Sequence, residues 1–235
     1  MFEVEDVHWW FVSRRNFIAQ AFDRMGVFTK STSVIADIGA GTGGMIAFLQ
    51  RYGAVIGVEP SIVGRSLAKS RGVTLRNGNA EKTGLRTASC DVVCLFDVLY
   101  HKGVDNDMAL REAYRVVKKG GHVVITDCAM PFLYGPNDHA VGGRERYTIS
   151  MLEARVKKAG FSIRFSSYLF FLLFPIFVAK RLSGKLVVRN RERSDVRMVH
   201  SLINVVLIYV CIVEAFILRF VRFPWGSSLI LIGQK

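Results

Sequence analysis

The stretch VIADIGAGTGG, residues 34–44, decides the fold of this chain. A short apolar run ends in Asp37, and four glycines follow within the next few residues. Glycine weakens ordinary helices and strands, so such a cluster marks a backbone that turns sharply or lets another group come close. The stretch therefore predicts a strand that ends in a tight turn beside a binding site.

Strand and helix patterns alternate on both sides of this turn. We predict a helix over 6–25, strands at 33–39 and 54–59, helices at 43–52 and 61–71, strands at 73–77, 91–99 and 122–127, and helices at 105–121 and 148–160. Strands separated by helices predict a parallel sheet covered by helices on both faces. Ligands of such sheets bind beyond the carboxyl ends of the strands, where the glycine turn lies.

The composition indicates a folded, basic protein. The chain has 235 residues, of which 51% are hydrophobic, and its net charge is +13. This charge favours an anionic partner, namely nucleic acid, a membrane surface or a phosphorylated substrate, with a solvated basic face as the alternative. The four cysteines form no C-x-x-C pair, so we expect reduced core residues in a cytoplasmic protein. Acidic residues at 3, 5 and 6 argue against a secretory signal.

Two acids narrow the choice of ligand. The glycine spacing alone is compatible with a dinucleotide fingerprint or with a turn that holds no ligand. Asp37, however, stands just before the turn, where a carboxylate would repel a pyrophosphate. Glu59 ends the second strand and can accept both hydroxyls of a ribose. The pair favours S-adenosylmethionine, whose sulfonium and amino groups are positive, over a nicotinamide cofactor.

Four motifs in this order resemble those of class I S-adenosylmethionine-dependent methyltransferases: VIADIGAGTGG, VIGVEPS, NGNAEKTGL and DVLYH. The resemblance covers residues 34 to about 165. It implies a Rossmann-like, seven-stranded, mostly parallel α/β sheet whose last strand is antiparallel. The cofactor-binding positions it implies are Asp37, Gly39, Ala40, Gly41 and Gly43 around the methionine part, Glu59 and Pro60 at the ribose, and Asn79 and Ala80 at the adenine. Asp97 would line the bottom of the cofactor site, near the amino acid portion of the cofactor. Many relatives have Asp at position 79, and the oxygen of Asn79 would replace it.

The acceptor side contributes the candidate catalytic residues. His101 follows the fourth predicted strand and would be a general base, or would pack within its loop. The loop 128–148 resembles that of a narrower subgroup, associated with glycan, lipid and natural-product pathways, and it adds His139 and Tyr147 as catalytic candidates. Asp138, Arg144 and Arg146 are the candidate substrate-binding residues. The two arginines would suit a phosphate or carboxylate on the acceptor, or would pair with acids such as Asp138 to order the loop. The scattered histidines and acids predict no metal site.

The C-terminal third is apolar and basic. Residues 168–179 are almost wholly apolar but too short to span a bilayer, and 198–223 form a longer apolar stretch. We reject a spanning helix because Asn204 and Glu214 would lie in mid-membrane and because the strand after it belongs to the sheet. The stretch would pack on the core or act as a lid that touches anionic lipid at the inner face of the membrane.

The predicted organisation is an N-terminal helical cap (1–30), a cofactor-binding core (31–167), an apolar and basic helical insertion (168–224) and the last strand (225–235). The predicted function is methyl transfer from S-adenosylmethionine to a small, hydrophobic, lipid-linked or glycan acceptor. The alternatives are an NAD(P)-dependent oxidoreductase, a nucleic-acid methyltransferase, and a non-enzymatic membrane-associated binding module. The sequence leaves the oligomeric state open.

Overall fold

The computed structural model describes residues 2–28, 33–186 and 199–235, and it contains one sheet. Its strands are β1 (Ser33–Ile38), β2 (Gly53–Val58), β3 (Cys90–Phe96), β4 (Val117–Cys128), β5 (Ser162–Leu169) and β6 (Ser228–Gln234). They lie in the order β2-β1-β3-β4-β6-β5. β1 to β4 are parallel, and β6 runs antiparallel between β4 and β5. The Rossmann-like order and the antiparallel last strand were both expected.

The sheet has one strand fewer among the described residues than the seven predicted, and it is mixed. The described residues form six strands, and two of the five strand pairings are antiparallel. The missing strand is the predicted one at 73–77, which makes a single bridge between Val58 and Arg76. Two backbone hydrogen bonds join it to β2 and the residue after it: the amide of Arg76 donates to Gly57, and the amide of Glu59 donates to Arg76. Glycines at 72 and 78 bound this segment, so the chain turns away before a ladder can form.

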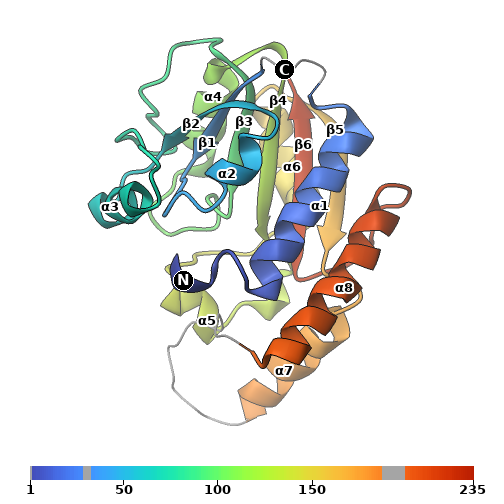
Figure 1. Ribbon diagram of the computed structural model, residues 1–235. Helices are drawn as coiled ribbons and strands as arrows, with labels where there is room; N and C mark the ends of the chain where they lie inside the picture. The colour runs from blue at the N-terminus through green and yellow to red at the C-terminus, as the bar shows by residue number, and fades with distance from the viewer. Residues whose placement is uncertain (1, 29–32, 187–198) are drawn as a thin grey trace.

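Helices cover both faces of the sheet, as predicted (Figure 1). The helices around the core are α1 (Trp9–Met25), α2 (Ile46–Leu49), α3 (Ile62–Ser70), α4 (Asn106–Val116) and α6 (Ile149–Lys158). Asp105 caps α4 by accepting the amide of Met108. The helix predicted at 43–52 is reduced to the single turn of α2, because glycines occupy its first positions and β2 begins at Gly53.

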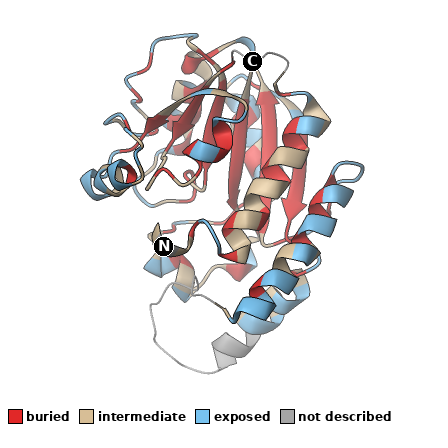
Figure 2. Ribbon diagram, in the orientation of Figure 1, coloured by how far each residue is buried: buried red, intermediate tan, exposed pale blue. Residues whose placement is uncertain are grey.

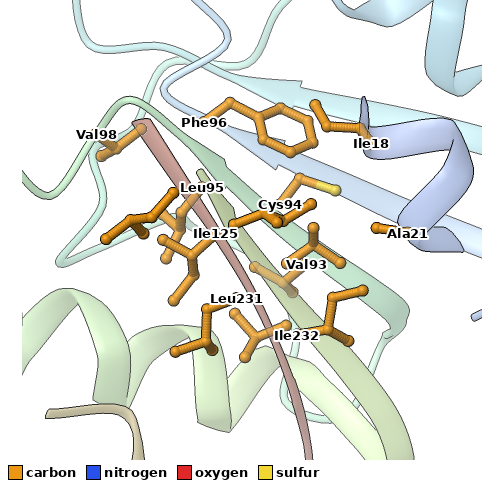
Figure 3. Packing of buried hydrophobic residues seen from close by; sticks show 14 of the residues in the cluster. Ile18, Ala21, Val93, Cys94, Leu95, Phe96, Val98, Ile125, Leu231 and Ile232 are labelled. Atoms are coloured by element: carbon orange, nitrogen blue, oxygen red, sulfur yellow. The ribbon is translucent and has the colours of Figure 1, made fainter. Parts of the chain in front are cut away.

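The core lies between the sheet and its helices. β3 is buried along nearly its whole length, and Ile18 and Ala21 of α1 lie beside its Cys94 and Phe96 (Figure 3). β1, β3 and β6 are buried almost throughout, and β2, β4 and β5 are buried toward their carboxyl ends, whereas the outer helices expose their outward sides (Figure 2). All four cysteines are free, and three of them are buried. This arrangement confirms that the cysteines are core residues.

The insertion starts and ends at one edge of the sheet. β5 and β4 both pair antiparallel with β6, so β4 and β5 point the same way and end at the same edge. We call this the carboxyl edge, since β1 and β3 end there too. β5 continues to Leu169, two residues beyond the predicted core boundary. α7 (Phe174–Leu186) and α8 (Ser201–Leu218) then follow, and β6 starts at Ser228 against the ends of β4 and β5.

α8 runs alongside α1, in the same direction (Figure 1). At its start, the side chain of Asn204 accepts the amide of Trp9 at 2.8 Å and donates to the carbonyl of Val7 at 2.9 Å. At its end, Arg24 of α1 donates to the carbonyl of Leu218 at 2.7 Å. Glu214 is fully buried and accepts the amides of Phe171 and Leu172. The polar side chains in the middle of α8 therefore face protein.

The Asn204 contact should contribute measurably to stability. Replacing Asn204 with Ala leaves a backbone amide and a carbonyl without their partners, so we expect the free energy of unfolding to fall by about 1–3 kcal/mol. Urea denaturation followed by circular dichroism measures the change. Val205→Ala is the matched control, because Val205 is 46% exposed on the same turn of α8, and its cost should stay within about 0.5 kcal/mol. Equal costs for the two variants would show that the Asn204 hydrogen bonds do not hold α8 on α1.

Candidate active site

The glycine turn lies at the carboxyl edge between β1 and α2. Gly39, Gly41 and Gly43 all have positive φ, which only glycine adopts without strain. A Cβ at Gly41 would meet no atom of the described protein within 4 Å, so the space above this residue is open. A Cβ at Gly39 would lie 2.6 Å from a methyl group of Val98. The turn is thus closely packed below and open above, which suits a bound ligand.

Four carboxyl groups stand at or just past the ends of four neighbouring strands. Glu59 follows β2, Asp37 lies near the end of β1, Asp97 follows β3, and Asp127 lies near the end of β4. The first three are predicted cofactor-binding positions. Asp127 was not predicted, although it ends the apolar run HVVITD in the same way that Asp37 ends its own.

Asp37 has an oxygen that no described residue satisfies. The side chain is 2% exposed, and its Oδ2 is buried without a hydrogen-bond partner among the described residues. Burial, opposed by the nearby Arg14 and assisted by Glu59, raises the pKa of Asp37 to about 7. A buried acceptor without a partner is costly. A positively charged ligand next to the turn would supply that partner and favour the ionised form.

Glu59 is fixed in place by the backbone. Its Oε2 accepts the amide of Gly41 at 2.8 Å, and its Oε1 accepts the amide of Ser61, also at 2.8 Å. Each carboxylate oxygen can accept more than one hydrogen bond, so both still have room for a ligand hydroxyl. Pro60 is exposed beside it. The predicted ribose position is thus joined directly to the glycine turn.

Asn79 departs from the prediction in one respect. Its Oδ1 accepts the amide of Lys82 at 2.7 Å and closes a local turn. We expected this oxygen to bond an adenine amino group, but it is already engaged, so the side-chain amide is the freer group. Ala80, the next residue, is buried. Both residues follow the segment 73–77, in the connection between β2 and β3.

The N-terminal segment closes over the acids and the glycine turn. Arg14 of α1 forms an ion pair with Asp97, and its guanidinium lies over the ring of Trp10. Glu5 accepts the hydroxyl of Thr42, within the glycine turn, at 2.6 Å. Arg71 pairs with Glu5 at 3.1 Å and so ties this segment to the end of α3. The roles of Glu5 and Arg14 could not be predicted, because both depend on contacts with residues distant in the chain.

One group of metal-ligating side chains occurs within the described ranges, formed by Asp97, Asp127 and Cys128. Their scattered positions in the sequence hid this proximity. Burial raises the pKa of Asp127 and of Cys128 well above their ordinary values, which favours their neutral forms. Asp97 already has Arg14 as its counter-ion. The group therefore lacks the free negative charge that a divalent ion requires.

His101 lies just beyond β3, opposite the loop 128–148. It forms a backbone bridge with Gly143, and the Lys102 amide donates to Gly142 at 2.9 Å. The imidazole is half-buried and lies against the ring of Tyr100, with the centroids 4.2 Å apart. Burial lowers the pKa of His101 below its ordinary value. The ring is thus neutral near pH 7 and able to accept a proton.

The other two catalytic candidates are placed differently. His139 is exposed on α5 (Pro136–Ala140), and its ring contacts Tyr134 at 5.0 Å. Tyr147 is fully buried, donates to the carbonyl of Leu99 at 2.8 Å and accepts from Asn106 at 2.7 Å. A catalytic role for Tyr147 is contradicted by this burial, because a hydroxyl with both partners inside the protein cannot reach an acceptor. Tyr147 instead holds the loop against the end of β3.

The acceptor-binding candidates form an internal ion pair. Arg146 Nε donates to Asp138 at 2.8 Å, and both side chains are buried. Asp138 also accepts from the Gly135 amide and from Arg181 of α7. Arg144 is exposed and donates to the carbonyl of Val104 at 3.0 Å. Of the two roles left open by the sequence, ordering of the loop is the one that the contacts of Asp138 and Arg146 fit.

Comparison with known proteins bears on this site. Residues 36–125 match the model of the methyltransferase domain family. This segment of the chain is a methyltransferase domain, and its cofactor is S-adenosylmethionine. The cofactor-binding half of the chain, from β1 to β4, coincides with the matched range. No curated protein matched the chain in a sequence search.

Solved structures of low sequence identity share the fold. A SAM-dependent methyltransferase of Thermotoga maritima, described as a possible histamine N-methyltransferase, is 21% identical with a TM-score of 0.58, and the match covers 97% of this chain and 92% of that one. A SAM-dependent methyltransferase of Archaeoglobus fulgidus is 14% identical with a TM-score of 0.59, and 94% of each chain is covered. At these identities the likeness supports the fold and leaves the acceptor open.

The residues of the site fit the cofactor. The unsatisfied oxygen of Asp37 suits a positively charged group, the open space above Gly41 admits it, and the anchored carboxylate of Glu59 suits a pair of hydroxyls. These residues would hold the cofactor of the methyltransferase at the carboxyl edge. A pyrophosphate cofactor would instead add negative charge to a row of acids.

Cofactor binding should weaken in acid because of Asp37. The pKa of Asp37 is about 7, so its negative charge is lost as the pH falls through 7 and the attraction for a cation is lost with it. Linkage to one proton predicts a dissociation constant roughly tenfold higher at pH 6 than at pH 8. Calorimetry at the two pH values measures this ratio. Asp37→Asn should bind weakly at both, whereas the surface control Asp107→Asn should follow the wild type; a flat wild-type profile would contradict the assignment.

The ion pair of Asp138 should be structural. Asp138→Leu leaves Arg146 buried without its counter-ion, and we expect a loss of about 3–5 kcal/mol in the free energy of unfolding. Arg144→Met removes a charge from the same loop at an exposed position and should cost less than about 1 kcal/mol. Chemical denaturation of both variants measures these losses. Comparable losses would argue that Asp138 and Arg146 contribute no more than a surface pair.

Proposed function

We propose that this methyltransferase modifies a small hydrophobic acceptor, either lipid-linked or a glycan. The observation that supports this most directly is the placement of the insertion, which begins and ends at the carboxyl edge next to the cofactor site. An insertion at this edge contributes the surface that an acceptor meets first. Its first segment, residues 170–179, contains only apolar residues.

The loop after β4 adds to the same apolar surface. Phe132 is 53% exposed, and its ring lies 6.3 Å from that of Phe174 at the start of α7. The ion pair between Arg181 and Asp138 joins α7 to α5 at 3.1 Å. Loop and insertion are therefore connected on the acceptor side. An acceptor entering between them would meet aromatic side chains, which favours an apolar molecule or a sugar ring.

His101 supports transfer to a hydroxyl. When bound, the cofactor supplies a methyl group that its sulfonium makes electrophilic. A neutral imidazole next to the cofactor site can take the proton that an acceptor hydroxyl loses as its oxygen attacks. Positioning of the hydroxyl against the methyl group would supply the rest of the acceleration. Asp97 precedes His101 in the loop after β3. It forms an ion pair with Arg14, which makes its carboxylate a poorer base.

The basic charge also raises the nucleic-acid alternative. Fourteen of the 32 Lys and Arg residues lie after residue 153, where only three acids occur. These residues alternate with apolar runs, whereas a nucleic-acid surface would interleave basic and polar side chains. We therefore rank a hydrophobic acceptor first.

Isotope transfer tests the proposed acceptor. Cell extract is incubated with the protein and cofactor labelled in its methyl group, and the lipid, aqueous and nucleic-acid fractions are counted. We expect label in the lipid fraction, and none with Asp37→Asn. Label confined to nucleic acid would overturn the proposal.

His101 can then be tested on the labelled acceptor. If His101 is the base, His101→Asn should lower kcat by about 10²–10⁴ while binding the cofactor normally. His122→Asn is the matched control, because His122 of β4 pairs with Val92 of β3, away from the carboxyl edge, and its replacement should leave kcat unchanged. Full activity of the His101 variant would remove it from the mechanism.

A further inference from the structure

α8 places its polar side chains against the protein and its apolar side chains outward. Its buried positions include Asn204, Cys211 and Glu214, whereas its outward positions are almost all aliphatic or aromatic. A helix at the surface of a globular protein normally places its polar side chains outward. The outward side of α8 is exposed along its length in Figure 2.

The exposed apolar residues follow one stripe. They recur at spacings of four and three residues, and each is at least half exposed: Leu202 66%, Val206 52%, Tyr209 66%, Val213 55%, Phe216 58% and Phe220 64%. Ile203, Val205 and Ile212 widen the stripe on its flanks. A contiguous apolar surface of this extent marks a site of association with a protein or a membrane. We call it the α8 face.

Two occupants could cover the α8 face, a second copy of the chain or a bilayer. A helix that pairs with another helix usually has a narrow apolar seam with charged residues on both sides. Between Ser201 and Leu218 the only charged residue is Glu214, and it is fully buried. The α8 face therefore has no charged flank to set a register with a second helix, which favours lipid.

The charge distribution matches an anionic bilayer. Between residues 180 and 222 there are nine Lys and Arg and three acids. Arg219 and Arg222 are exposed directly after α8, beside the exposed Phe220. Basic residues next to an apolar helix face attract anionic headgroups.

The same contacts argue against a helix that crosses the bilayer. α8 is the one helix in the described part of the chain that is long and apolar enough to cross a membrane by length and composition, and 22% of that span is buried inside the protein. The contacts of its polar side chains are what argue against a crossing. Asn204 and Glu214 bind the backbone of the core, and Arg24 of α1 caps the far end. A crossing would break all three contacts. We infer that the α8 face lies on the surface of an anionic membrane, with its stripe inserted among the lipids and the rest of the protein outside.

Vesicle flotation tests this inference without any knowledge of the acceptor. The full chain is mixed with vesicles of phosphatidylglycerol and phosphatidylcholine, or of phosphatidylcholine alone. We expect flotation with the anionic vesicles and little with the neutral ones. The triple variant Leu202→Gln, Val206→Gln, Val213→Gln should lower the partition coefficient at least about tenfold, because three apolar side chains no longer leave water. Arg219→Gln with Arg222→Gln should lower it and remove most of its salt dependence.

A matched control separates the α8 face from exposed apolar residues in general. Ile62, Val63 and Met108 are 77%, 68% and 53% exposed on α3 and α4. Replacing all three with Gln should leave flotation unchanged. Circular dichroism and urea denaturation check that each triple variant is folded.

Two results would overturn the inference. One is equal flotation of the wild type and the folded α8 variant, or equal binding to neutral and anionic vesicles. The other concerns the oligomeric state measured by light scattering without lipid. If the wild type is a dimer and the α8 triple variant is a monomer, a second copy of the chain covers the α8 face. Methyl transfer plays no part in these readouts, so their outcome is independent of the proposed acceptor.

Discussion

Like charges cannot be collected at one edge of a sheet unless each is neutralised. Glu59, Asp37, Asp97 and Asp127 stand at the ends of four adjacent strands, and the structure treats each differently. Backbone amides hold Glu59, a guanidinium pairs with Asp97, and burial favours the protonated form of Asp127. Asp37 and Asp127 each keep a buried Oδ2 without a hydrogen-bond partner among the described residues. Burial raises the pKa of Asp127 well above its ordinary value, whereas the pKa of Asp37 is about 7, so Asp37 is the one of the two that ionises near neutral pH. The preference of the site for a cationic ligand follows from this ionisable carboxyl group without a partner.

Local sequence predicted the parts of the site that depend on position along a strand. Asp37, the glycine turn and Glu59 could be placed because a strand ending in an acid and a turn fixes where its side chains emerge. The segment at 73–77 misled because an apolar, β-branched run predicts a strand even where flanking glycines leave only one bridge to form. Tyr147 misled for a different reason, since its partners Leu99 and Asn106 are more than 40 positions away in the sequence.

The N-terminal helix connects the site to the insertion. One end of α1 carries Arg14, which pairs with Asp97, and Trp9, whose amide binds Asn204 of α8. Neither contact could be predicted from the sequence, because an arginine in a helix and an asparagine in an apolar run can each bind many different partners. Together they set the α8 face at a fixed orientation relative to the cofactor site. A bilayer on that face would therefore lie at a fixed distance from the transferred methyl group.

The position of β6 has a consequence for biosynthesis. β4 and β5 are joined only through β6, which spans residues 228–234. Until those residues leave the ribosome, both strands present an unpaired edge, and the apolar segments made before them have no finished sheet to pack against. At synthesis rates of about 5–20 residues per second, the nascent chain waits several seconds in this state between β5 and β6. The strand order thus makes completion of the sheet a late event in synthesis.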